Sequence, residues 1–301
     1  MDSLDWNDLR YVLAVARAGS AAGAARALGV SHATVLRRVQ ALEQGVGTAL
    51  FDRLSTGYVP TDAGRKLLQA GESIESTLMD TTRVIDGQAS ELTGSIRFTT
   101  TDSLAACIAP PILASFSRRY PAIHVEMMIT NQRLDLDRRE ADVTLRPSAN
   151  PPESWVGMRL PRFDFGIYAA SSYLERRSNT AWPDLDWLLP GGPLAQGAAS
   201  RWLDAQLGDK PGIAHVDSFV GLRSLALAGM GVTVLPCFMA HDTPGLSLLQ
   251  AVPPEGSVDI WVLTHPHLRQ SARIQAFMEH VAEGVRAMRA SLAAPAAQPQ
   301  P

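Results

Sequence analysis

The sequence predicts an α/β chain that begins with a winged helix-turn-helix and continues, after one long helix, into a larger α/β domain. Two observations predict this fold class. Residues 20–64 carry the capping residues, apolar spacing and turns of two short helices and a hairpin, and from Ser95 onward strand and helix patterns alternate. A chain of 301 residues is long enough for about two domains, each with its own core.

The first of the two short helices begins after Ser20 and runs to Leu28. The Ser20 hydroxyl can accept from the free N–H groups of the first turn. Gly29 can end the helix, because glycine adopts the left-handed conformation without a steric penalty. Small residues let this helix approach the next one closely, as a short helix-turn-helix requires: Ala21, Ala24 and Ala25.

The second helix begins after Ser31 and has one apolar face. The apolar positions recur at the i, i+4, i+7 spacing of a single stripe and are Val35, Val39 and Leu42. In a helix-turn-helix this second helix reads bases. The candidate DNA-binding residues on it are Ser31, His32, Ala33, Thr34, Arg37 and Arg38. An alanine-rich helical pair with a glycine turn is also an ordinary packing motif, and that alternative stays open here.

A hairpin wing is predicted after the second helix. Gly45 and Gly47 are expected to break that helix. Residues 49–60 then read as two strands with a glycine turn, and they add Arg53 to the candidate DNA-binding residues. Thr61 is placed to cap a third helix.

The order of these elements resembles the N-terminal region of the LysR-type transcriptional regulators. The matching segments are Leu42-Glu43, Leu50-Phe51-Asp52-Arg53 and Thr61-Asp62-Ala63-Gly64. The resemblance implies a DNA-binding domain over residues 1–62 that binds double-stranded promoter DNA sequence-specifically. It also implies a homodimer or homotetramer and a small-molecule effector. The alternative is a two-lobed small-molecule binding protein or enzyme without a gene-regulatory role.

Charge is unevenly distributed along the chain. The formal net charge is −3, yet residues 1–66 contain eight Arg and Lys against six Asp and Glu. Arg37, Arg38 and Arg53 lie in the predicted DNA-binding elements, so attraction to phosphates is concentrated there. Because this region carries so small a positive excess, we expect modest affinity per DNA-binding domain and therefore binding as an oligomer.

A linker helix is predicted over residues 63–90. Apolar residues at seven-residue, a/d-like offsets suit a seam with a partner helix. In LysR-type proteins this helix pairs two subunits, and the resemblance implies the same here. The alternative is a solitary amphipathic helix that lies on the second domain. The candidate dimer-interface residues are Leu67, Ile74, Leu78 and Ile85.

Strand and helix patterns alternate through residues 91–292, which predicts an α/β domain with a largely parallel sheet. Strands are expected at 96–100, 123–129, 142–145, 165–170, 212–216, 231–235 and 258–263, and helices at 110–120, 131–139, 198–207, 218–228 and 269–290. The pattern resembles the periplasmic-binding-protein-like effector domain of LysR-type regulators. The resemblance implies lobe I over about 91–161 and 266–292 and lobe II over about 162–265. The tail, residues 293–301, is expected to be disordered.

Ligand-binding residues are expected where the strands of an open α/β sheet end, because helix N-termini offer free N–H groups there. LysR-type effector clefts are lined from such places. The candidate effector-binding residues are Thr100, Thr101, Asp102, Ser103, Thr130, Arg146, Ser148, Asp217, Ser218 and Phe219. Thr101 and Ser103 can instead serve only as helix caps.

The charged candidates bear on the class of effector. Arg146 can bind an anionic effector, or it can pair with Glu140 or Asp142. Asp102 would repel a carboxylate unless Arg146 or a cationic effector neutralises it. The sequence therefore favours a polar or zwitterionic effector over a simple dicarboxylate.

Enzymatic motifs are missing from the sequence. The chain has no Gly-x-Ser-x-Gly elbow, phosphate-binding loop or His-Glu-x-x-His run, so we expect no catalysis and no cofactor. No metal site is expected either, because His265 and His267 lack a third ligand, and Cys107 and Cys237 are expected to be free core thiols. No apolar run approaches the roughly 20 residues of a membrane span, and the start lacks a signal-peptide pattern, so a cytoplasmic location is expected.

Overall fold

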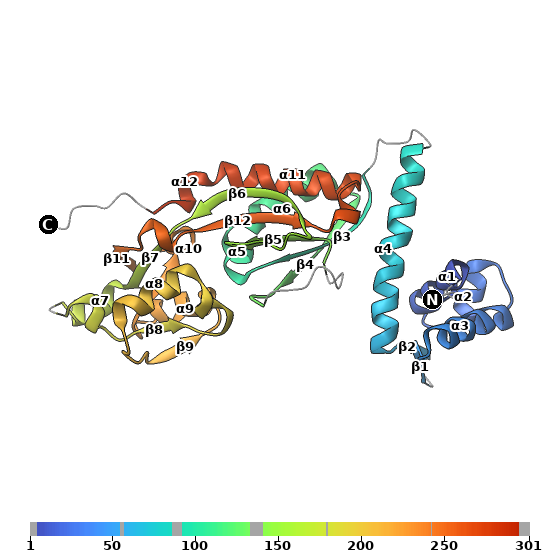
Figure 1. Ribbon diagram of the computed structural model, residues 1–301, viewed down its shortest axis with the longest axis horizontal. Helices are drawn as coiled ribbons and strands as arrows, with labels where there is room; N and C mark the ends of the chain where they lie inside the picture. Colours follow the sequence, from blue (N-terminus) through green and yellow to red (C-terminus); the bar gives the residue numbers. More distant parts are fainter. Residues whose placement is uncertain are drawn as a thin grey trace. The chain divides into compact units, whose positions relative to one another are not determined.

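The computed structural model describes residues 5–54, 57–85, 92–132, 141–178, 180–241 and 243–294. The chain divides into two compact units, residues 1–89 and 90–301 (Figure 1). Among the helices in these described ranges, none combines the length and apolar character needed to cross a membrane.

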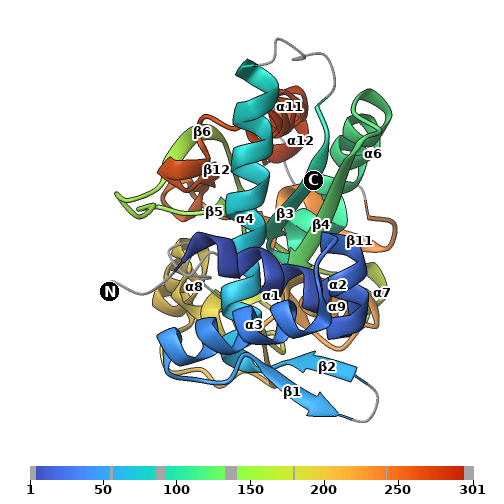
Figure 2. The same cartoon turned by 90° about the vertical axis from the view of Figure 1, so that its right-hand side faces the viewer.

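The first unit consists of helices around a small core, with a hairpin extending beside α3 (Figure 2). The predicted caps are confirmed. Ser20 Oγ accepts from Gly23 N at 3.1 Å, and Ser31 Oγ accepts from Thr34 N at 3.1 Å. Gly29 ends the first of the paired helices with a φ of 66°. The elements are α1 (Trp6–Ala18), α2 (Ala21–Leu28), α3 (His32–Val46), β1 (Phe51–Leu54), β2 (Gly57–Pro60) and α4 (Asp62–Ile85).

Helix α3 is longer than predicted. The expectation that Gly45 breaks the helix is wrong, because α3 continues to Val46 and ends at Gly47, whose φ is 76°. A glycine inside a helix costs only about 1 kcal/mol relative to alanine. Packing of the apolar face against α1 and α2 outweighs that cost, since the predicted stripe is fully buried: Val35, Val39 and Leu42.

The predicted wing is also confirmed. Strands β1 and β2 pair antiparallel, with Phe51 opposite Pro60. Thr61 Oγ1 accepts from Gly64 N at 3.0 Å and so caps α4. A Cβ on Gly64 would lie 2.0 Å from the Leu50 carbonyl oxygen, so only glycine permits this close approach between α4 and the start of the wing.

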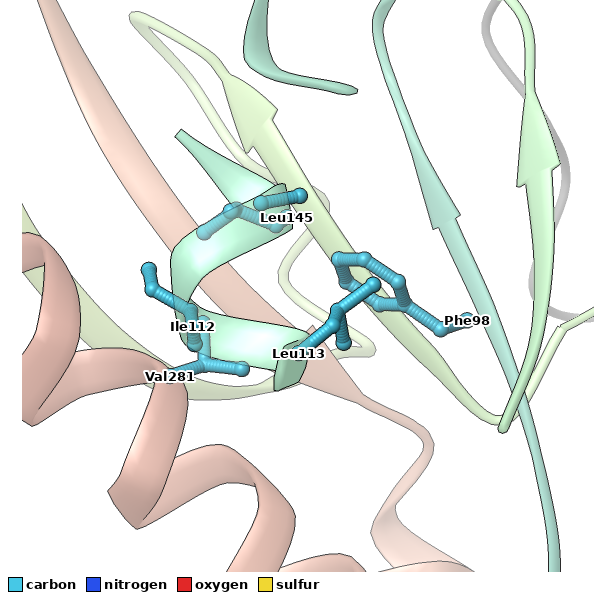
Figure 3. A pocket seen from close by; sticks show the side chains of 6 residues that line it. Phe98, Ile112, Leu113, Leu145 and Val281 are labelled. Carbon is cyan, nitrogen blue, oxygen red and sulfur yellow. The ribbon is translucent and has the colours of Figure 1, made fainter. Parts of the chain in front are cut away.

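The first lobe of the second unit is a five-stranded sheet in the order β4-β3-β5-β12-β6, with α6 and α11 packed against it (Figure 1). Figure 3 shows apolar side chains from the sheet and both helices around a space that is too small for a water molecule. Its elements are β3 (Gly94–Thr100), α5 (Asp102–Cys107), α6 (Ala109–Arg119), β4 (Ile123–Ile129), β5 (Val143–Pro147), β6 (Val156–Phe163), β12 (Val258–Thr264), η5 (Pro266–Leu268), α11 (Ala272–Ala287) and α12 (Arg289–Leu292).

The second lobe contains the three-stranded sheet β10-β7-β11 and the pair β8-β9. Trp187 and Tyr168 are among its fully buried side chains. Its elements are β7 (Phe165–Ala170), α7 (Ser171–Arg176), η2 (Trp182–Asp184), β8 (Leu188–Pro190), η3 (Gly192–Gln196), α8 (Ala198–Leu207), β9 (Ala214–Val216), α9 (Phe219–Leu227), β10 (Val232–Pro236), α10 (Cys237–Ala240), β11 (Leu246–Ala251) and η4 (Pro254–Gly256).

The expectation of a largely parallel sheet is wrong. Strand β3 runs parallel to β4 and β5, but β12 runs antiparallel to β5 and β6, and β7 runs antiparallel to β10 and β11. The chain leaves the first lobe along β6 and returns along β12 in the opposite direction. A pattern of alternating strands and helices does not reveal that reversal.

The position of the return crossing also differs from the sequence expectation. A lobe II over about 162–265 would include β12, but this strand pairs within the sheet of the first lobe. The chain therefore crosses back before Val258. Most of the helix expected at 131–139, the end of the linker helix beyond residue 85 and the tail from 295 lie outside the described residues.

Candidate functional site

The N-terminal turn of α3 presents the first candidate site. His32 and Ala33 are exposed, as is Arg37 one turn later. The Ser31 and Thr34 hydroxyls lie 2.8 Å apart, which fixes the cap of the helix. The predicted recognition helix therefore begins with a capped turn at which Ser31, His32 and Ala33 face solvent.

Arg38 has partners inside the first unit. Its Nη1 lies 2.9 Å from Asp8 Oδ1 and 3.5 Å from Asp5 Oδ2. Asp8 is only 6% exposed, so its carboxylate needs a positive partner. Arg38 thus holds α3 against the start of α1. The sequence did not identify Asp8, because the two residues are 30 positions apart and only the packing of α1 on α3 brings them together.

The wing is attached to α3 through Glu43. Its Oε1 accepts from Leu50 N at 2.8 Å and from Phe51 N at 3.4 Å. Arg53, on the exposed side of β1, lies over the ring of Tyr58 at 5.7 Å from the ring centre. This cation–π contact supports the guanidinium without neutralising its charge.

Helix α4 carries the predicted dimer residues in different environments. Leu67 and Ile74 are partly buried against the core of their own unit, whereas Leu78 is 63% exposed. The side chain of Ile85 lies outside the described residues. Glu75 pairs with Arg17 of α1, and this hydrogen bond raises the pKa of the arginine. Helix α4 is thereby fixed to the core of its own unit as far as Glu75.

A cavity of about 270 Å³ lies in the second unit, between strand ends of the first lobe and loops of the second. It brings together four of the predicted effector residues and adds four that were not selected. The lining residues are Asp102, Ile129, Thr130, Asn131, Gln132, Pro193, Asp217 and Ser218.

The remaining effector candidates do not line this cavity. Thr100 is fully buried and donates to Leu145 O at 2.9 Å. The Thr101 hydroxyl lies 3.3 Å from that of Ser103, which is 2% exposed, and it makes no side-chain cap on α5. Phe219 is 8% exposed, and the backbone of Ser148 pairs with β12. These residues therefore support the structure around the cleft but do not line it.

Asp102 connects the two lobes. Its Oδ2 accepts from Ser218 Oγ at 2.6 Å and from Val220 N at 3.3 Å, and its Oδ1 accepts from Ser103 N at 2.6 Å. Asn131 makes a parallel bridge, accepting from Asp102 N at 3.2 Å and donating to Asp217 O at 2.8 Å. Asn131 follows β4 in the strand-end loop Thr130-Asn131-Gln132, which the rule for open α/β sheets indicates, although only Thr130 of this loop was among the candidate effector-binding residues.

Arg146 stabilises the loop that forms one wall of the cavity. Its guanidinium donates to Gln132 O, to Thr130 O at 2.9 Å and to Thr99 Oγ1 at 3.2 Å. Burial lowers the pKa of Arg146 to about 10. The expected alternative of a pair with Asp142 is wrong, because Asp142 pairs with Arg97 at 3.0 Å, and Glu140 lies outside the described residues.

His265 and His267 contact each other, and the two cysteines, Cys107 and Cys237, form no disulfide. His265 Nδ1 accepts from His267 N at 3.3 Å and their rings stack. Both cysteines are free thiols, and burial raises the pKa of each, that of Cys237 to about 11. Within the described residues, no three His, Cys, Asp or Glu side chains gather as metal ligands.

A capped helix-turn-helix with a wing, joined by a long helix to a two-lobed domain with a polar cleft, defines a regulator with separate DNA-binding and ligand-binding parts. Family models agree with this division. Residues 6–65 match the bacterial regulatory helix-turn-helix protein, lysR family, and residues 89–286 match the LysR substrate binding domain. The chain therefore belongs to the LysR family of bacterial transcriptional regulators.

Individual relatives are similar at low identity. A transcriptional regulator of Xanthomonas campestris pv. campestris is 33% identical over 180 residues, which is 60% of this chain and only about half (52%) of the relative. The Mau operon transcriptional activator of Paracoccus denitrificans is 26% identical over 88% of this chain and 91% of its own. A full-length OxyR variant of Pseudomonas aeruginosa shares the fold, with a TM-score of 0.66, 15% identity and coverage of 95% of this chain and 96% of its own.

Proposed function

We propose that this protein binds promoter DNA through α3 and the wing, as a homodimer or homotetramer, and that a small molecule in the cavity between its lobes modulates the binding. The observation that carries the DNA-binding part is the capped N-terminal turn of α3. His32 and Ala33 are exposed there, and the wing attached through Glu43 carries the exposed Arg53.

Different basic residues have different roles in this proposal. The start of a recognition helix meets base edges in the major groove, so His32 and its neighbours read sequence. Arg37 and Arg53 are exposed and supply attraction to phosphates. Arg38 is paired with Asp8, so its role is to orient α3, and it leaves the set of direct phosphate contacts proposed from the sequence.

Coupling between the two parts requires an effector that binds two arrangements of the protein unequally. The cavity supplies hydroxyl, amide and carboxylate groups for a polar ligand, including Thr130, Asn131 and Asp217. Regulation by binding needs no catalytic step, and we therefore propose a non-enzymatic protein. Because its target is chromosomal DNA, we place it in the cytoplasm.

The test is a gel shift with the DNA upstream of its own gene, titrated with salt. Binding should be sequence-specific, and its affinity should fall steeply as salt rises. The variant His32→Ala should lose affinity for this upstream DNA, the matched DNA, by about 10-fold, while its affinity for the same DNA with a scrambled sequence stays the same.

The matched control is Gln40→Ala, an exposed change on the same helix, two turns after His32. It should keep the wild-type preference for matched over scrambled DNA. If His32→Ala weakens binding equally on matched and scrambled DNA, base reading by this residue is wrong. Equal affinity of the wild type for both DNAs would overturn the proposed function.

A further inference from the structure

We propose that Asp102 is a specificity-determining residue: its carboxylate occupies the N-terminus of α9 as an internal anion and thereby excludes carboxylate ligands from that side of the cleft. The proposal rests on the proposed effector role of the cavity. It adds a reason for the chemical class of effector that this chain accepts.

The donors around Asp102 form a set that suits one carboxylate. Ser218 Oγ and Val220 N belong to the second lobe, and Ser103 N belongs to the first. Three donors from two helices, at distances of 2.6–3.3 Å, surround its two oxygens. Backbone N–H groups at a helix start, together with the helix dipole, favour a negative charge. Asp102 supplies that charge from within the chain.

The Ser218 hydroxyl has no proton left for another anion. Its Oγ donates to Asp102 Oδ2 and accepts from Gly221 N at 3.0 Å. A hydroxyl has a single proton to donate, so a ligand carboxylate could use this group only by displacing Asp102. Such a ligand would also place a second negative charge beside the first, which is unfavourable.

The rest of the cavity does not compensate for this charge. Its lining contains a second carboxylate, Asp217, and no Arg or Lys among the described residues. The nearby Arg146 points its Nη atoms at Thr99, Thr130 and Gln132. The cleft is therefore rich in acceptors, which fits an effector bearing N–H donors or a positive charge.

Removing the Asp102 carboxylate should create a site for a free one. The experiment measures the melting temperature of the full chain with sodium acetate at about 0.1 M, against sodium chloride of the same ionic strength. For Asp102→Ala, acetate should raise the melting temperature of the second unit by about 2–4 °C. The wild type should show no such rise.

Two further variants give matched controls. Asp102→Asn fills the same volume and should not respond to acetate, because the place stays occupied. Asp217→Ala removes a carboxylate from the same cavity but frees no donor, since Asp217 takes part in the bridge through its backbone oxygen. It should also respond like the wild type. Asp102→Ser leaves room for acetate with a polar side chain, so the test does not depend on the folding of one variant.

The result that would overturn the proposal is an acetate response of Asp102→Ala and Asp102→Ser that does not exceed that of Asp217→Ala. Equal responses in all chains would mean a general salt effect and would likewise overturn the proposal. The gel shift separates this outcome from failure of the proposed function. An acetate response of Asp102→Ala, together with no sequence-specific DNA binding by the wild type, would support the role of Asp102 and refute the proposed DNA-binding function.

Discussion

Replacing Glu43 with alanine should weaken the attachment of the wing to α3. The carboxylate accepts from Leu50 N at 2.8 Å and, near the limit for a hydrogen bond, from Phe51 N at 3.4 Å. Leu50 is fully buried and Phe51 is 5% exposed, so water has little access to replace the lost acceptor. We therefore expect the cost of the substitution to be dominated by the Leu50 hydrogen bond.

The magnitude follows from that geometry. A hydrogen bond to a charged acceptor contributes about 1.5–3 kcal/mol, and the longer second bond adds little, so the free energy of unfolding should fall by about 2 kcal/mol. For a unit of this size, residues 1–89, that corresponds to a melting temperature lower by about 8–16 °C. Glu43→Gln keeps an oxygen acceptor without the charge and should lose about half as much.

The assay is thermal unfolding of the full chain by calorimetry, with the two units resolved, followed by gel shifts on the upstream DNA. Because the wing carries Arg53, the DNA affinity should fall in the same order as stability, with Glu43→Ala weaker than Glu43→Gln. The reasoning is refuted if Glu43→Ala unfolds within about 0.5 kcal/mol of the wild type, the range of an ordinary surface change.

Three further predictions follow from the same structure. Arg53→Ala should lower the slope of log affinity against log salt by about one unit. Arg38→Ala should leave the slope unchanged, because Arg38 is paired with Asp8. Equal slopes for Arg53→Ala and the wild type would remove Arg53 from the phosphate contacts. Leu78→Glu on α4 should shift the full chain to a smaller species in light scattering and weaken DNA binding; an unchanged oligomer would contradict a dimer seam along this helix. Burial raises the pKa of Cys237 from 9.0 to about 11. Because the folded protein then holds this proton more tightly than the unfolded chain, the free energy of unfolding should be unaffected by this thiol below pH 9 and should fall by up to about 2 kcal/mol between pH 9 and 11. Cys237→Ala should show a flatter dependence of the unfolding free energy on pH over that window.

The DNA-binding half of the fold was predictable because its signals are local. A capping hydroxyl acts on an N–H three residues later, as Ser20, Ser31 and Thr61 do, and the sequence alone identifies each of them. The apolar stripe of α3 has the same short range. The end of α3 was not predictable, because a helix interior tolerates a glycine when packing compensates, and packing is not a local property.

Much of the second unit was predictable in the same way, since individual strands and helices have their own periodicity. The direction of β12 and its place in the first sheet were not, because they depend on where the chain returns from the second lobe. The general rule for α/β sheets indicated the strand-end residues Asp102, Thr130, Asp217 and Ser218 as effector-binding, and all four line the cavity; their contact with an effector stays a prediction.

By itself, therefore, the sequence determined the family, the winged helix-turn-helix and the loops from which the cleft is built. Only the tertiary structure decided the partners of the charged side chains. Arg38 meets Asp8 across 30 residues of sequence, and Asp102 meets Ser218 across 116. The physical reason is that the partner of a charged side chain depends on which surfaces of the folded chain pack together. Those contacts have no fixed spacing along the sequence.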